Sequence, residues 1–72
     1  MSKTAEVHQK IAENIQRTRK EQNLSQEELA LKAGLNRAYI GYIERGERKP
    51  SVGTLNKISN ALKTPLKTLF EF

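Results

Sequence analysis

A chain of 72 residues that has no cysteine and a formal net charge of +5 is large enough for one small domain, and it excludes disulfides and thiolate metal sites. It holds no run of about 20 apolar residues, as a membrane span needs, and its polar start lacks the apolar centre of a signal peptide. We therefore expect one domain in the cytoplasm, with an anionic partner that the charge favours without identifying it.

The chain is expected to begin with a loose tail over residues 1–4, followed by a helix over roughly residues 5–22. Val7, Ile11 and Ile15 recur every four residues, which is typical of an amphipathic helix packed on a core. This stripe predicts that the first helix contributes one face to an all-helical domain.

A helix-turn-helix pattern follows. Ser25 and Glu28 form an S-x-x-E capping box, which predicts that a helix starts at this serine. Gly34 then suits the left-handed backbone at a helix end. Asn36 can cap a second helix that continues through about Arg45. The short connection predicts that the two helices meet at a steep angle.

The second motif helix has two different faces when its residues are placed at about 100° per step. Ile40 and Ile43 fall on one side and are expected in the core. The opposite side combines long hydrogen-bond donors with very small residues and suits close approach to a polar surface; it consists of Arg37, Ala38, Gly41, Tyr42 and Arg45.

The segment LSQEELALKAGLNRAYIGYIERGERKPS, residues 24–51, resembles the phage-repressor-like (Xre/Cro type) helix-turn-helix family. Within that family it is most similar to the small controller proteins of restriction-modification systems. The resemblance implies a compact five-helix, lambda-repressor-like all-α domain whose second and third helices form the helix-turn-helix, at residues 25–45. It also implies a homodimeric regulator that binds a pseudo-palindromic operator, and a controller would activate and repress its own promoter.

Major-groove binding by this unit assigns roles to particular side chains. Arg37 is the leading base reader because a guanidinium can take guanine O6 and N7 together, and Ala38 can touch a thymine methyl. Tyr42 and Arg45 can meet base edges or the backbone, and Asn36 can read adenine if capping does not occupy it. Phosphate contacts are expected from residues at the ends of the motif helices and beyond: Gln26, Arg48, Lys49 and Ser51.

Arg19 extends the stripe of the first helix and needs a partner if it is buried. Glu44 lies on the shoulder of the second motif helix beside its core residues, so we predict an ion pair between the two, which the family pattern also implies. The alternative is that Arg19 reaches solvent along its aliphatic stem. Either arrangement is structural.

The C-terminal part predicts two more helices. Ser51 can cap a helix in which Val52, Leu55, Ile58 and Leu62 form a stripe, and Pro65 can open a last short helix. The final residues, 64–72, are rich in large apolar side chains. We predict that this end forms a two-fold dimer interface, although all of its apolar residues could instead complete the monomer core; the residues concerned are Leu66, Leu69, Phe70 and Phe72.

Other functions are less well supported by the residues. Glu27 occupies a position that touches the polymerase sigma subunit in related repressors, although it can simply complement the helix dipole. The same fold also serves antitoxins and bridging factors, which bind proteins. The single histidine, His8, has no nucleophile or metal-ligating group near it in sequence, so we expect no enzyme activity, cofactor, metal or small-molecule ligand.

Overall fold

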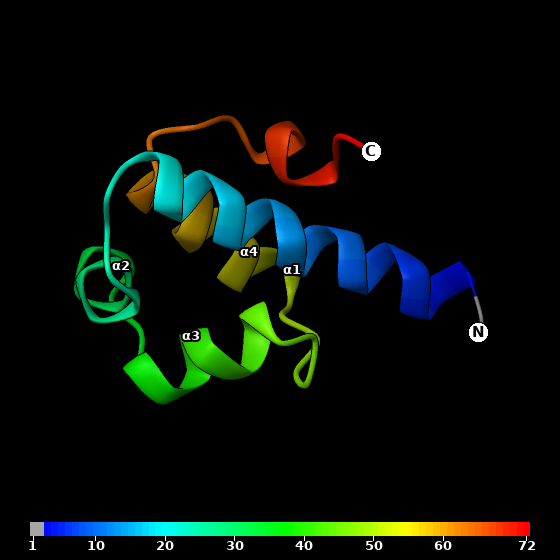
Figure 1. Ribbon diagram of the computed structural model, residues 1–72, viewed down its shortest axis with the longest axis horizontal. Helices are drawn as coiled ribbons and strands as arrows, with labels where there is room; N and C mark the ends of the chain where they lie inside the picture. The colour runs from blue at the N-terminus through cyan, green and yellow to red at the C-terminus, as the bar shows by residue number, and fades with distance from the viewer. Residues whose placement is uncertain (1–2) are drawn as a thin grey trace.

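The computed structural model describes residues 3–72, with side chains from residue 5 onward. Four α-helices are followed by one 3₁₀ helix (Figure 1): α1 (Lys3–Glu21), α2 (Gln26–Ala33), α3 (Arg37–Glu44), α4 (Val52–Ala61) and η1 (Leu66–Phe70). The first two residues of the expected tail lie outside the described residues, and Lys3 already belongs to α1.

The expected fifth α-helix is a 3₁₀ helix, so the prediction of five α-helices is confirmed only for the first four. Pro65 precedes η1 and provides no side-chain cap, and the segment is only five residues long. Such short segments commonly adopt the tighter 3₁₀ geometry, since they can form few α-helical hydrogen bonds.

The long helix α1 organises the domain. The C-terminal segment lies along one side of α1 and α3 lies on the other, while the N-terminal turns of α1 project beyond the remaining helices (Figure 1). Contacts between α2 and α3 and between α2 and α4 complete the packing. This arrangement leaves one long face of α3 uncovered at the edge of the domain.

The core draws apolar side chains from every helix: Ile11, Ile15, Leu29, Ala30, Ile40, Ile43, Leu55, Ile58, Leu62 and Leu69. Two residues of the expected stripes are not part of it. Val7, in the N-terminal part of α1, and Val52, the first residue of α4, are both exposed. Within residues 3–72, no helix is both long enough and apolar enough to cross a membrane.

Candidate nucleic-acid interface

The residues that the sequence predicts form both ends of α2 and the start of α3. Ser25 Oγ accepts from the Glu28 backbone N–H at 3.0 Å, and the Glu28 carboxylate accepts from the Ser25 N–H at 2.8 Å. The hydrogen bond from the Ser25 backbone N–H lowers the pKa of the Glu28 carboxyl most strongly, and the Ser25 side chain lowers it further. Gly34 ends α2 in the left-handed conformation, with φ of 68°. Asn36 then caps α3, its Oδ1 accepting from Ala38 N at 2.7 Å.

An ion pair between Arg19 and Glu44 ties α1 to α3. Arg19 Nε donates to Glu44 Oε2 at 2.7 Å and Nη2 donates to Oε1 at 2.9 Å, while Nη1 donates to the Leu24 carbonyl at 2.7 Å. The side chains are 9% and 1% exposed. The interaction is therefore the structural pair expected from the sequence, and Arg19 does not extend to solvent.

Gln26 joins this network from the first turn of α2. Its Nε2 donates to Glu44 Oε1 at 3.0 Å, so the buried carboxylate orients the amide. One of the two N–H groups on that nitrogen is thereby used, and the other is left over for a phosphate oxygen. The position of Gln26 thus depends on the same pair that fixes α3.

The outward side of α3 is formed by the predicted base-reading residues. Arg37, Ala38, Tyr42 and Arg45 are all exposed, and so is Asn36 at the start of the helix. Because Asn36 Oδ1 caps the helix, its amide nitrogen is the part that could reach a base. The side chains therefore share one surface, which we call the reading face and define as residues Asn36, Arg37, Ala38, Tyr42 and Arg45.

Gly41 has a different role from the one that its position on the helix suggested. It is buried, and a Cβ at this position would lie 3.1 Å from Arg45 Nη1 and 3.8 Å from Gln26 Oε1. The expectation that Gly41 belongs to the exposed face is therefore wrong. Its missing side chain instead makes room for Arg45 and Gln26 to lie across the helix.

Two arginines lie near the ring of Tyr42. The guanidinium carbon of Arg45 lies 5.2 Å from the centre of the Tyr42 ring, and that of Arg48 lies 5.3 Å from it. Both distances are within the range of cation–π attraction. The ring thus brings the end of α3 and the following loop into one basic cluster.

Arg45 also pairs with Glu47, which sequence reasoning did not select. Arg45 Nε donates to Glu47 Oε2 at 2.8 Å, and Nη2 makes a longer contact of 3.4 Å with Oε1. The pair is about half exposed, and its hydrogen bond raises the pKa of Arg45 and lowers that of Glu47. A search at helical spacings misses it because Glu47 lies past the end of α3.

The remaining predicted phosphate-binding residues follow α3 in the sequence. Arg48 and Lys49 are exposed in the loop after α3, and Ser51 is exposed at the start of α4. Ser51 Oγ accepts from Thr54 N and bonds to Thr54 Oγ1, both at 3.1 Å. In this structure its hydroxyl therefore serves the helix cap, and a phosphate contact would have to replace the bond to the Thr54 hydroxyl.

The C-terminal segment divides between core and surface. Leu69 is fully buried and Leu66 is half-buried against the core, whereas Phe70 is 40% exposed and Phe72 is 60% exposed. The assignment of Leu69 to a dimer interface is thus wrong, because a fully buried side chain has no surface to offer. The exposed phenylalanines remain candidates.

Asn14 fixes that segment to α1 and was not identified from the sequence. Its Nδ2 donates to the carbonyls of Leu69 at 3.0 Å and Glu71 at 3.1 Å. Lys10 Nζ lies 5.9 Å from the centre of the Phe72 ring. A polar residue among the buried positions of α1 was the available signal, but its partners are more than 50 residues away and no local rule finds them.

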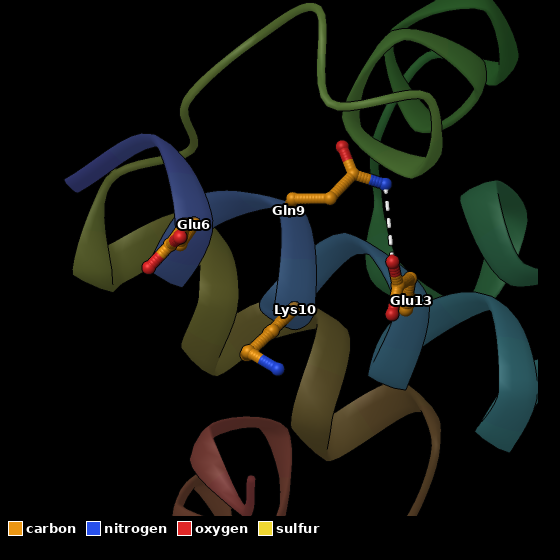
Figure 2. Close-up of a pocket in the computed structure, with 4 residues that line it drawn as sticks. All are labelled: Glu6, Gln9, Lys10 and Glu13. Carbon is orange, nitrogen blue, oxygen red and sulfur yellow. Dashed lines mark hydrogen bonds between the residues drawn. The ribbon is translucent and has the colours of Figure 1, made fainter. Parts of the chain in front are cut away.

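A shallow pocket of about 360 Å³ lies along α1. It is lined by Glu6, Gln9, Lys10 and Glu13, and Figure 2 shows the Gln9 amide directed at Glu13, to which its Nε2 donates at 3.3 Å. All four side chains are exposed and come from one helix. None of the four is an apolar residue, whereas small-molecule sites are lined mainly by hydrophobic and aromatic side chains.

Comparison with known proteins agrees with this geometry. The helix-turn-helix family HTH_3 matches residues 15–69. Control protein C.SmaI of Serratia marcescens is 42% identical over 64 residues, covering 89% of this chain and 76% of that protein. Control protein C.BamHI of Bacillus amyloliquefaciens is 48% identical over 50 residues, covering 69% of this chain and 62% of that protein.

Solved structures show the same fold. The restriction-modification controller protein C.AhdI from Aeromonas hydrophila superposes with a TM-score of 0.85 at 37% identity, over 86% of this chain and 94% of that chain. C.Esp1396I bound to a 25 base pair operator site gives a TM-score of 0.82 at 33% identity, over 89% and 84% of the two chains. The chain therefore belongs to the helix-turn-helix family HTH_3 and is a transcriptional regulator that resembles the controller proteins of restriction-modification systems.

Proposed function

We propose that the protein is a homodimer that binds a pseudo-palindromic operator by placing α3 of each subunit in the major groove. The reading face carries this proposal, because it is exposed and combines arginines with the small Ala38. A major groove about 12 Å wide admits such a helix and exposes distinct donors and acceptors for each base pair.

Base reading is assigned to the reading face, with Arg37 as the principal reader. Among residues 3–72, Arg37 has no carboxylate partner, so its guanidinium is available for the two acceptors of a guanine. Tyr42 and Arg45 lie further along the same surface. Phosphate contacts from residues on both sides of α3 set the register; these are Gln26, Arg48, Lys49 and Ser51.

Dimerisation is assigned to the exposed part of the C-terminal segment. Phe70 and Phe72 expose large rings, Leu66 is half-buried in the same segment, and Asn14 binds two backbone carbonyls of that segment. A two-fold axis through this surface would use the same rings from both subunits. The paired α3 helices would then meet half-sites about one helical turn apart.

A controller role adds contact with the transcription machinery. Glu27 is exposed in the first turn of α2, next to the proposed DNA surface, where a sigma subunit could touch it. We propose that the protein activates from one operator and represses when a second is filled, acting in the cytoplasm on the nucleoid. Promoter fusions with Glu27→Ala should lose activation and keep repression.

Selection of bound DNA from a random pool tests the proposed function and does not require the operator sequence. We expect an enriched pseudo-palindrome with half-site centres about 10 base pairs apart, or a multiple of that spacing. An enriched single asymmetric half-site would contradict the dimer. Failure to enrich any sequence would contradict operator recognition itself.

A further inference from the structure

The end of α3 holds Glu47 in a fixed position beside Arg45. Gly46 has φ of 75°, its N–H bonds to the Ile43 carbonyl at 3.0 Å, and the Glu47 N–H bonds to the Tyr42 carbonyl at 2.8 Å. This pair of bonds is the Schellman arrangement that closes a helix. The backbone of Glu47 is therefore part of the helix end, and its carboxylate is positioned before any ligand binds.

Three contacts together restrict the Arg45 side chain. Glu47 bonds to its Nε and Nη2, Tyr42 lies against the guanidinium, and the absence of a side chain at Gly41 lets Nη1 lie close to the helix. A long arginine side chain otherwise loses much rotamer freedom when it binds. Arg45 has already lost part of this rotamer freedom in the free protein, so binding restricts it less.

The pairing leaves a defined part of the guanidinium unused. Glu47 takes the Nε–H and one N–H of Nη2, so the N–H groups of Nη1 and the second one of Nη2 remain. Those groups form the end of the guanidinium, which can still bind two acceptors on a base edge. The carboxylate also offsets the charge that would attract Arg45 to any phosphate, whatever the sequence.

We propose that Glu47 determines operator specificity: its carboxylate holds Arg45 with the Nη end available to a base and weakens sequence-independent binding by the same arginine. The pair is half exposed, and such pairs contribute little to stability. We therefore expect the Arg45–Glu47 pair to affect which DNA sequence is bound more than it affects the stability of the fold. This inference rests on the proposed function, since it needs an operator to be read.

The test compares Glu47→Gln with the wild type and with Glu6→Gln, which makes the same change in charge at an exposed position on α1. Fluorescence anisotropy gives Kd for the operator selected by the wild type and for a scrambled duplex of equal length, at one salt concentration. The ratio of the two constants is the specificity. Thermal melting of each variant verifies that the fold is retained.

We expect Glu47→Gln to reduce the specificity ratio by about 5-fold or more, because an oriented bidentate contact discriminates between bases to at least this degree. Glu6→Gln should leave the ratio unchanged. In an Arg45→Ala background, Glu47→Gln should have no further effect on the ratio, since the residue acts through the arginine.

An unchanged ratio in Glu47→Gln would overturn the inference, as would an equal fall in Glu6→Gln or a fall that persists without Arg45. These results leave the proposed function intact, because the wild type would still prefer its operator. If the wild type itself selects no sequence, the proposed function fails and the inference fails with it. The two failures are thus distinguished by the wild type alone.

Discussion

Two arginine–glutamate pairs meet at the end of α3 and differ in their surroundings. Glu44 pairs with Arg19 inside the domain, and the next residue, Arg45, pairs with Glu47 at the surface. The buried pair has given up its hydration, so each member depends on the other. The surface pair keeps water and can accept a new partner. Two consecutive residues therefore have different roles: Glu44 stabilises the fold, and we propose that Arg45 reads DNA.

The C-terminal segment shows the same contrast between neighbours. Leu69 is fully buried, and Phe70 beside it exposes much of its ring. Because a five-residue 3₁₀ helix brings successive side chains to different sides, one residue can complete the core while the next remains available to a second subunit. In both places, burial distinguishes residues that sequence alone grouped together.

The largest expected effect is loss of the buried pair. Arg19→Leu removes the guanidinium and leaves the Glu44 carboxylate buried without its countercharge, which should cost about 3–5 kcal/mol of unfolding free energy. For so small a domain this is a large part of the total stability. Urea unfolding followed by circular dichroism, at a fixed protein concentration, measures it.

Arg17→Leu is the matched control, because Arg17 is an exposed arginine on the same helix. Its urea midpoint should stay close to that of the wild type. An Arg19→Leu variant as stable as this control would contradict the structural role of the buried pair.

The next effect separates Leu69 from Phe70. Leu69→Ala should lower the unfolding free energy by about 2–5 kcal/mol, as expected for a large core side chain. Phe70→Ala should spare the isolated subunit and weaken its self-association by about 2 kcal/mol or more, as at an interface hot spot. Urea unfolding at low concentration and sedimentation equilibrium distinguish the two. If Phe70→Ala does not change self-association, the proposal that Phe70 forms part of the dimer interface is wrong.

A smaller and more uniform effect is expected from Lys49. If a dimer neutralises about six to ten phosphates, log affinity should fall with log salt at a slope of roughly −5 to −9. Lys49→Ala should weaken binding to operator and scrambled DNA to a similar extent, and it should reduce the size of the slope by about 1 for each phosphate that is no longer neutralised. Anisotropy titrations at several salt concentrations measure this, and a weakening restricted to the operator would show base reading instead.

The smallest effect concerns the surface pair and pH. The Arg45 hydrogen bond lowers the pKa of Glu47, so the stability from this pair is fully present above the ordinary glutamate pKa of about 4.3. It is lost only as pH falls through the lower value of the folded protein. We expect an NMR titration of the Glu47 carboxyl to show this lowered midpoint, which Arg45→Ala should return to normal. No difference between the two proteins would mean that the pair does not form in solution.

Local rules were sufficient for much of the motif. Capping preferences identified Ser25 and Asn36, and the left-handed end of α2 followed from Gly34, because these features depend on residues within a single turn. Periodicity also found most of the core. It also placed Val7 in the core, although this side chain is exposed, because periodicity does not show how far along a helix its neighbours extend.

The features that were missed depend on contacts beyond one helix. Asn14 binds carbonyls at the far end of the chain, and Glu47 reaches Arg45 around a helix terminus. Gly41 was placed on the correct helix, but the space that it leaves is filled by Arg45 and Gln26, which only the packed side chains reveal. The sequence therefore identified α3 as the exposed helix, but only the packed structure showed how the Arg45 side chain is held.

Selection from a random DNA pool, carried out in parallel with the wild type and Arg37→Ala, tests most directly whether α3 reads bases. We expect both proteins to select the same palindrome, except that the variant loses the preference at one base pair of each half-site. The variant should also lose about 1–3 kcal/mol of binding free energy per half-site. Identical base preferences for the two proteins, at every position, would contradict the assignment of Arg37 as the principal base reader of α3.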